Sequence, residues 1–143
     1  QQALLIQPEM WREWFKPFYK QYADIAHANN KFVFMHSDGN ISSIYEDLVE
    51  IGVDAMNSQL ATMDLADLAE RVKGRITFWG EIDRQNVLTS KDPEDGRAAV
   101  REIASHLYDS KGGVIAQLAY DLGVVPRTVE AAFDEWQLIS KAH

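Results

Sequence analysis

Apolar side chains recur along the first part of the chain at intervals of three and four residues. This spacing, between Pro8 and Asn30, is typical of a helix with one apolar face. Pro8 suits the first position of such a helix, and Pro17 predicts a kink within it. The pair Asn29-Asn30 predicts the end of the helix in a left-handed turn.

Four later segments show a different pattern. They are short and almost wholly apolar, as are strands that a parallel sheet buries on both faces. They cover residues 31–36, 53–57, 75–79 and 114–118. Helix signals lie between and after them, such as Asp64, the pair Asp92-Pro93 and Pro126. We predict helices over residues 41–51, 64–73, 93–110 and 126–136.

Strands that alternate with helices in this way predict an α/β protein with a parallel sheet. Two architectures fit the pattern, a doubly wound sheet and a TIM-type barrel. A full (β/α)₈ barrel has about 250 residues, or roughly 31 for each unit. The 143 residues of this chain hold between four and five such units, and no linker is visible. We therefore predict a single domain over residues 1–143, with enough parallel (β/α) units for half a barrel.

Composition narrows the classes of partner and chemistry. The net charge is −8, which argues against nucleic acid or an anionic membrane as the main partner. No apolar run approaches the roughly 18 residues of a membrane span. The chain has no cysteine, so disulfides, thiolate metal sites and cysteine nucleophiles are excluded, and a cytoplasmic location is expected. Because the chain begins with Gln1 rather than Met, we also expect further sequence upstream.

Polar side chains follow each predicted strand, at the edge where parallel α/β proteins place their sites. His36 and Asp38 are two residues apart, so in an extended chain they point to the same side and can share a metal ion or a proton. The alternative is a histidine at a strand end and an aspartate in a turn. No glycine-rich dinucleotide motif, phosphate loop or serine elbow is present.

The other strand ends offer further candidates. Glu81, Asp83 and Arg84 supply an acid, a possible metal ligand and an anion clamp, or else form a local ion pair in a solvated loop. Asn57 and Gln59 can orient a polar ligand or form a turn. A tyrosine after the fourth strand can donate a proton or simply pack, and this residue is Tyr120.

Five short segments carry motifs that occur together in a known family. They include H-S-D-G-N at residues 36–40 and I-G-V-D-A-M-N at residues 51–57. The others are residues 8–17, 78–83 and 112–115. In this order the five segments resemble the uroporphyrinogen decarboxylase (URO-D) superfamily, and the H-S-D-G-N run resembles its methyltransferase-like paralogues more than its true decarboxylases. The resemblance implies a (β/α)₈ barrel of which this chain is the C-terminal half.

The resemblance also implies two kinds of chemistry. Lyases of this superfamily remove acetate carboxyl groups from a tetrapyrrole without a metal or cofactor, and zinc methyltransferases move methyl groups between a corrinoid protein and a thiol. The substrate is accordingly a tetrapyrrole or a methyl donor, the second reaction needs a corrinoid protein as partner, and the cofactor is zinc or none. His36 and Asp38 match two zinc-ligand positions, and the third falls near Tyr120.

Residue roles follow from the strand ends and the resemblance together. The candidate catalytic residues are His36, Asp38, Glu81 and Tyr120. The candidate substrate-binding residues are Asn57, Gln59, Asp83 and Arg84. The candidate metal ligands are His36 and Asp38.

A non-catalytic interpretation stays open, in which a barrel fragment or paralogue acts as a binding or assembly module. The lack of cysteine ligands and of half of the barrel favours it. Half a barrel leaves two open sheet edges, and open edges associate unless they are covered. We therefore expect the chain to pair with the missing N-terminal half or with a second copy. We also expect Trp11, Trp14 and Phe18 to pack against the sheet or against this contact.

Overall fold

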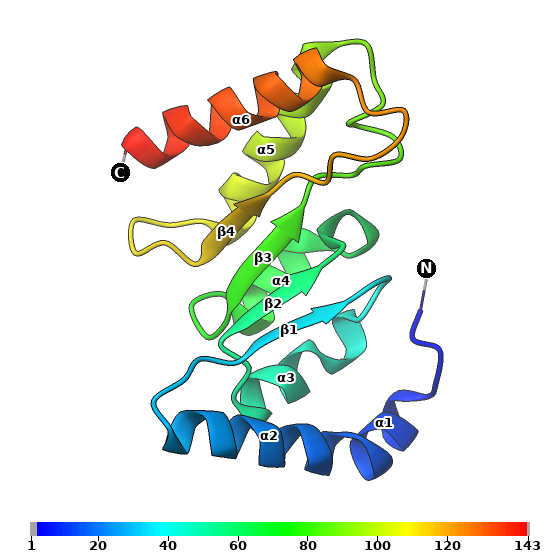
Figure 1. The fold of residues 1–143 in the computed structure, drawn as a ribbon, viewed down its shortest axis with the longest axis vertical. Coiled ribbons are helices and arrows are strands. Elements are labelled where there is room, and N and C mark those ends of the chain that lie inside the picture. Colours follow the sequence, from blue (N-terminus) through cyan, green and yellow to red (C-terminus); the bar gives the residue numbers. More distant parts are fainter. Residues whose placement is uncertain (1–2, 143) are drawn as a thin grey trace.

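The structure is a computed structural model that describes residues 3–142. Six α-helices and four strands alternate over this range as the apolar pattern predicts (Figure 1). The helices are α1 (Pro8–Trp14), α2 (Lys16–Ala28), α3 (Tyr45–Ile51), α4 (Leu65–Val72), α5 (Pro93–Leu107) and α6 (Pro126–Lys141). The strands are β1 (Phe34–Ser37), β2 (Ala55–Ser58), β3 (Thr77–Glu81) and β4 (Val114–Gln117).

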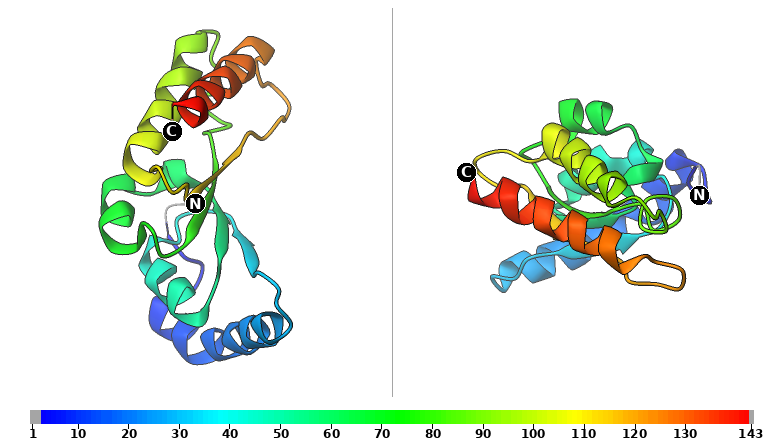
Figure 2. Two further views of the ribbon diagram at one scale, coloured as in Figure 1. Left: turned by 90° about the vertical axis from the view of Figure 1, so that its left-hand side faces the viewer. Right: turned by 90° about the horizontal axis from the view of Figure 1, so that it is seen from above.

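The four strands form one parallel sheet in the order β1-β2-β3-β4. The prediction of an α/β fold with a parallel sheet is therefore confirmed. A doubly wound sheet reverses its strand order at a switch point, and this sheet does not. The sequential order is consistent with part of a (β/α) barrel. Figure 2 shows α3, α4 and α5 together on one face of the sheet, where they cover it.

The hydrophobic core lies between these helices and the sheet. One residue from each strand points into it, and the register aligns them in a row: Met35, Met56, Phe78 and Val114. Two core residues, Met56 and Phe78, are fully buried, and the Tyr45 ring of α3 packs against Phe78 at 5.8 Å between centroids. Burial of such side chains is the main stabilising contribution to the fold.

The opposite face of the sheet is open at β1. Exposed and half-buried residues alternate along this strand, and the Phe34 side chain is 57% exposed. The expectation that all strands are buried on both faces is therefore wrong for β1 and also for β4, whose residues are half-buried or exposed, although it holds for β2. The reason is that β1 is an edge strand and α3 to α5 cover only the other face. Phe34 finds partial cover from an edge-to-face contact with the Trp79 ring.

The predicted kink at Pro17 is a complete break between two helices. α1 ends at Trp14 and α2 begins at Lys16, with Pro17 in the first turn of α2. Of the three aromatic residues that we expected to pack, only Trp11 is buried, and it stacks on Tyr19. Trp14 and Phe18 are 56% and 62% exposed, so neither is buried within this chain, and their packing against a partner contact stays a prediction.

Most other boundaries agree with the sequence pattern to within a few residues. Asp64 caps α4 through hydrogen bonds from two amides, and Asp92 caps α5. Gly52 ends α3 in a left-handed conformation with φ of 92°. The segment predicted as one helix over residues 41–51 is a short 3₁₀ turn, η1 (Ser42–Ile44), followed by α3. Among the described helices none is long and apolar enough to cross a membrane.

Candidate functional site

Polar side chains meet on the open face of the sheet near the carboxyl ends of its strands. Parallel register places His36, Asn57, Trp79 and Ile115 in one row across the four strands. This row is adjacent to the core row, so its side chains point to the opposite face. The strands thus place the imidazole of β1 and the amide of β2 side by side.

The Asn57 amide determines which ring nitrogen of neutral His36 carries the hydrogen. Its Nδ2 donates to the carbonyl oxygen of Trp79 at 2.9 Å and to Gln117 Oε1 at 2.5 Å. A carbonyl oxygen only accepts hydrogen bonds, so the amide nitrogen must face it. Asn57 Oδ1 therefore faces His36 Nδ1, at 2.6 Å, and this ring nitrogen carries the hydrogen. In the neutral ring the other nitrogen, Nε2, is left with a free lone pair.

One charged side chain, Asp38, lies near Nε2 of His36, and a second, Arg84, lies near Asp38. Asp38 Oδ2 is 3.8 Å from His36 Nε2, and Asp38 Oδ1 is 3.9 Å from Arg84 Nη2. His36 and Asp38 are both more than half exposed, and the Arg84 side chain is 34% exposed. The structure thus brings together an imidazole, a carboxylate and a guanidinium that were expected from separate strand ends.

The loop that carries Asp38 is tied to the segment after β2. The amide of Gly39 donates to Gln59 Oε1 at 2.7 Å, in a buried hydrogen bond. Asn40 Nδ2 donates to the carbonyl oxygen of Thr62 at 2.6 Å. The side-chain oxygen of Gln59 therefore holds the loop, whereas the sequence led us to place Gln59 among the substrate-binding residues.

A cavity of about 370 Å³ lies beside this cluster, at the carboxyl ends of β2 and β3. Gln59, Glu81, Asp83 and Arg84 contribute to its lining. Glu81 is the most buried acid in this group, at 8% exposed. The cavity thus combines a carboxylate and a guanidinium and can accept a polar ligand with both donor and acceptor groups.

The Asp83 carboxylate accepts hydrogen bonds from residues of its own turn. Its Oδ1 accepts from the amides of Gln85 and Asn86, and its Oδ2 accepts from Asn86 Nδ2. Burial by itself raises the pKa of the Asp83 carboxyl, but these hydrogen bonds outweigh burial and the pKa lies below its usual value of 3.8. The carboxylate caps the turn that presents Arg84, which is a structural role.

Tyr120 lies apart from these residues. It is in the loop between β4 and α6, its side chain is 70% exposed, and it does not contribute to the lining of the cavity. Gln117 lies closer to the cluster, because it accepts the hydrogen bond from Asn57. Sequence reasoning did not single out Gln117, although its place at the end of the fourth strand was a signal for it.

The residues present do not fit a zinc site. Within residues 3–142, no three histidine, aspartate or glutamate side chains converge as a metal would require. His36 and Asp38 supply two donors, and the cationic Arg84 lies beside the second of them. A nearby guanidinium opposes the binding of a cation at this carboxylate.

Comparison with known proteins gives a family. The model of the family described as uroporphyrinogen decarboxylase (URO-D) matches residues 1–136. A search of curated proteins found no match. The matched range covers all four strands and reaches into α6, so it includes every element that holds the polar cluster. The chain therefore belongs to the uroporphyrinogen decarboxylase (URO-D) family.

Proposed function

We propose that the chain forms the C-terminal half of a (β/α)₈ barrel and supplies polar groups to a URO-D-type active site. The sequential parallel order of the strands supports this, as do the helices gathered on one face of the sheet. In such barrels the site lies at the carboxyl ends of the strands, where His36, Asp38 and Arg84 meet.

The β4 edge of the sheet has room for a further strand. A groove of about 430 Å³ runs between β4 and α6, lined by Val114, Ala116, Phe133 and Trp136 among others. Trp136 Nε1 is buried and has no acceptor within the described residues. A strand added beside β4 would supply carbonyl oxygens and apolar side chains to this groove. The groove therefore supports completion of the barrel at this edge.

The chemistry that this site supports best is proton transfer to a carboxylate-bearing substrate. Loss of CO₂ breaks a carbon–carbon bond and leaves the electron pair on the substrate carbon, which must then take a proton. His36, protonated at both ring nitrogens, can deliver this proton from Nε2 while Nδ1 stays bonded to Asn57. Asp38 stabilises the charged ring, and Arg84 can bind a substrate carboxylate.

The observation that carries this proposal is the chain of hydrogen bonds from Gln117 through Asn57 to His36. It fixes the ring so that Nε2 faces the open side of the sheet. For a member of the URO-D family, the substrate would be a tetrapyrrole with carboxylate side chains. A metal-free decarboxylase-like site agrees with these residues better than the zinc methyltransferase that the H-S-D-G-N run suggests.

The test measures binding of uroporphyrin, the oxidised form of the substrate after which the family is named, to the full chain. We expect His36→Ala and Arg84→Gln to weaken binding by about tenfold each, since each removes a polar contact worth 1–2 kcal/mol. Arg127→Gln, on α6, is the matched control and should bind as the wild type does. Equal binding by all four proteins would contradict the proposal.

Calorimetry with zinc and cobalt on the same proteins separates the alternatives. Stoichiometric metal binding that His36→Ala abolishes would favour methyl transfer, with a corrinoid protein as partner. Binding of neither porphyrin nor metal would favour the non-catalytic alternative, in which the chain is a binding or assembly module.

A further inference from the structure

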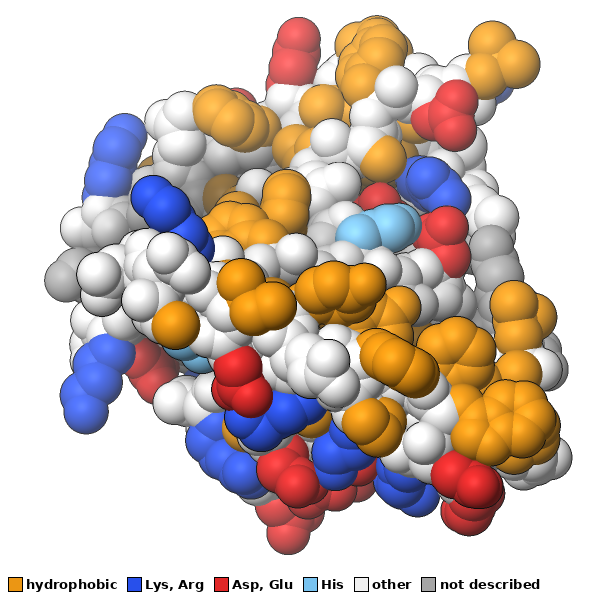
Figure 3. Space-filling view, turned by 60° about the horizontal axis from the view of Figure 1, so that its bottom comes forward, with side chains coloured by type: hydrophobic (Ala, Val, Ile, Leu, Met, Phe, Trp, Pro, Cys, Tyr) orange, Lys and Arg blue, Asp and Glu red, His pale blue; other side chains and the backbone are white. Residues whose placement is uncertain are grey.

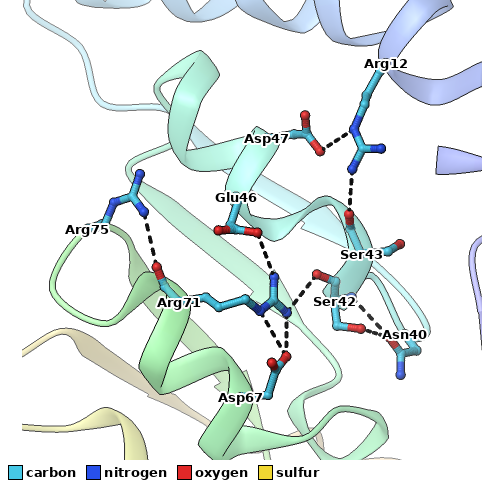
Figure 4. Close-up of polar contacts among 9 residues, drawn as sticks. All are labelled: Arg12, Asn40, Ser42, Ser43, Glu46, Asp47, Asp67, Arg71 and Arg75. Carbon is cyan, nitrogen blue, oxygen red and sulfur yellow. Dashed lines mark hydrogen bonds and ion pairs between the residues drawn. The ribbon is translucent and has the colours of Figure 1, made fainter. Parts of the chain in front are cut away.

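Two arginines hold the start of α3 from two neighbouring helices, and the first is Arg71 of α4. Its Nη2 donates to the carbonyl oxygen of Ser42 at 3.1 Å, and its Nη1 donates to Glu46 Oε2 at 3.3 Å. Asp67, one turn earlier on α4, accepts from Nε and Nη2 of the same guanidinium. Arg71 thus joins α4 to a main-chain carbonyl and to a carboxylate four residues further along (Figure 4).

Arg12 of α1 makes the same pair of contacts, with partners that lie one residue later in the sequence. Its Nη2 donates to the carbonyl oxygen of Ser43 at 3.0 Å, and its Nε donates to Asp47 Oδ2 at 2.9 Å. The carbonyl and the carboxylate are again four residues apart, on the same helical segment. Figure 4 shows the two guanidinium groups meeting this segment from α1 and from α4.

The contacts are partly shielded from solvent. The Asp47 side chain is 10% exposed and also accepts from Lys16 Nζ at 2.8 Å, and the Arg71 side chain is 24% exposed. A planar guanidinium can bind a carbonyl and a carboxylate at once in a fixed geometry, which the point charge of a lysine cannot. Two such contacts side by side fix both the position and the rotation of the segment they hold.

The segment held in this way, η1 and the start of α3, directly follows the loop that carries Asp38. The loop begins after β1, where the Gly39 amide is bonded to Gln59. Asn40 then accepts hydrogen bonds from the amide and hydroxyl of Ser42, so the loop is linked directly to the carbonyl that Arg71 holds. The loop is therefore fixed at its start by Gln59 and at its end by the two arginines.

We propose that Arg71 and Arg12 are positioning residues that keep Asp38 in contact with His36 and Arg84. This inference rests on the proposed function, since it gives the loop a task at the site. The two contacts of Asp38 are 3.8 and 3.9 Å long, and the interaction of charges falls with distance. A loop released at Ser42 and Ser43 would let the carboxylate move away from both partners.

The test compares Arg71→Gln with Arg71→Lys and with a control at another arginine. Arg101→Gln is the matched control, because Arg101 of α5 also binds two carboxylates, Glu94 and Glu135, but no residue of the loop. Two quantities are measured on the folded full chain: affinity for uroporphyrin, and hydrogen exchange of the Gly39 and Ser42 amides.

We expect Arg71→Gln to weaken porphyrin binding by roughly tenfold and to speed exchange of both amides, because small displacements of a polar group are costly at such a site. Arg71→Lys should restore part of both effects. Arg101→Gln should change neither, even though it lowers overall stability. Wild-type affinity and exchange in Arg71→Gln would overturn the inference.

The hydrogen-exchange measurement tests the role of Arg71 independently of porphyrin binding, and so independently of the proposed function. If the wild type does not bind the porphyrin, the proposed function fails by itself. Faster exchange of the two amides in Arg71→Gln, but not in Arg101→Gln, would still support the role of Arg71 in holding the loop. Unchanged exchange would overturn that role as well.

Discussion

Two amide side chains of the candidate site, Asn57 and Gln59, form hydrogen bonds with other residues of the protein. Asn57 was expected to face a ligand, but both ends of its amide are used within the sheet, by His36 on one side and by Trp79 and Gln117 on the other. The side-chain oxygen Oε1 of Gln59 accepts a hydrogen bond from the Gly39 amide. Asn and Gln can donate and accept at once, which suits them to link strand ends.

Asn57→Asp tests the role of this amide. A carboxylate has no N–H donors, so it would face the carbonyl oxygens of Trp79 and Gln117 without a hydrogen between them. We expect the free energy of unfolding at pH 7 to fall by about 1–3 kcal/mol, as for other buried groups left unsatisfied. The measurement is urea denaturation. Gln21→Glu makes the same chemical change on the exposed side of α2 and should cost less than about 0.5 kcal/mol.

Gly80 has a packing role that its motif position does not reveal. A Cβ at this residue of β3 would overlap the side chain of Leu60, which is fully buried. Gly80→Ala should therefore lower the free energy of unfolding by about 1–3 kcal/mol through overpacking. In a Leu60→Ala background the same change should cost clearly less, because the overlapping atoms are gone. Additive losses in the double variant would show that the overlap does not cause the effect.

At the scale of whole elements, local signals predicted the helices and strands well. Caps such as Asp64 and Asp92 act within a few residues, so the sequence displays them directly. The contacts of Arg12 and Arg71 with the start of α3 join residues about thirty apart, and no local pattern marks them. The open face of β1 was also missed, because an apolar run does not say which strand lies at an edge.

A histidine–aspartate pair joins α2 to the sheet and makes this contact depend on pH. His27 Nε2 lies 2.8 Å from Asp54 Oδ2, which also accepts from the Val33 amide. Burial raises the pKa of Asp54, but the hydrogen bonds from His27 and Val33 lower it more, so the pKa lies below its usual 3.8. The ionised carboxylate thus stabilises the fold above about pH 4, and this stabilisation is lost as the pH falls through the lowered pKa.

Asp54→Asn should remove this dependence. We expect the variant to be less stable than the wild type by about 1 kcal/mol at pH 7, and the difference to shrink as the pH falls from about 4 to 2. Unfolding by urea at several pH values measures it. Asp24→Asn breaks an exposed ion pair with Lys20 on α2 and serves as the control, with little change at any pH. A difference for Asp54→Asn that does not change with pH would contradict the assignment.

In the molecule as a whole, α3, α4 and α5 cover one face of the sheet, and the other face is open at the edge strands β1 and β4. Strand-end residues could be predicted from the sequence because parallel strands bring their carboxyl ends to one edge, and His36, Asp38 and Arg84 do meet there. Tyr120 could not be placed in this way, since its position depends on the path of the loop between β4 and α6. Exposed apolar side chains also remain on the surface of α1 and α2, where a partner could cover them.

Four exposed side chains form an apolar stripe along α1 and α2, which we define as Trp14, Phe18, Tyr22 and Ile25. Within α2 the spacing of three or four residues puts Phe18, Tyr22 and Ile25 on one side of the helix, and Trp14 lies at the end of α1, just before the break. Figure 3 shows hydrophobic side chains gathered in a band on this face, beside a region of mixed charge. Together with the open edge of β1, the stripe predicts that the chain pairs with the rest of the proposed barrel or with a second copy of itself.

Phe18→Glu combined with Tyr22→Glu tests this pairing. We expect the apparent mass of the wild-type chain in sedimentation equilibrium to rise with protein concentration. The double variant should need at least about tenfold higher concentration for the same rise, because charges at the centre of an apolar contact oppose its burial. Leu122→Glu changes a fully exposed residue in the loop before α6 and should associate as the wild type does. A wild-type chain that stays monomeric at all concentrations would exclude self-association. Binding to a separately expressed N-terminal half of the proposed barrel would then test whether the stripe is covered when the barrel is complete.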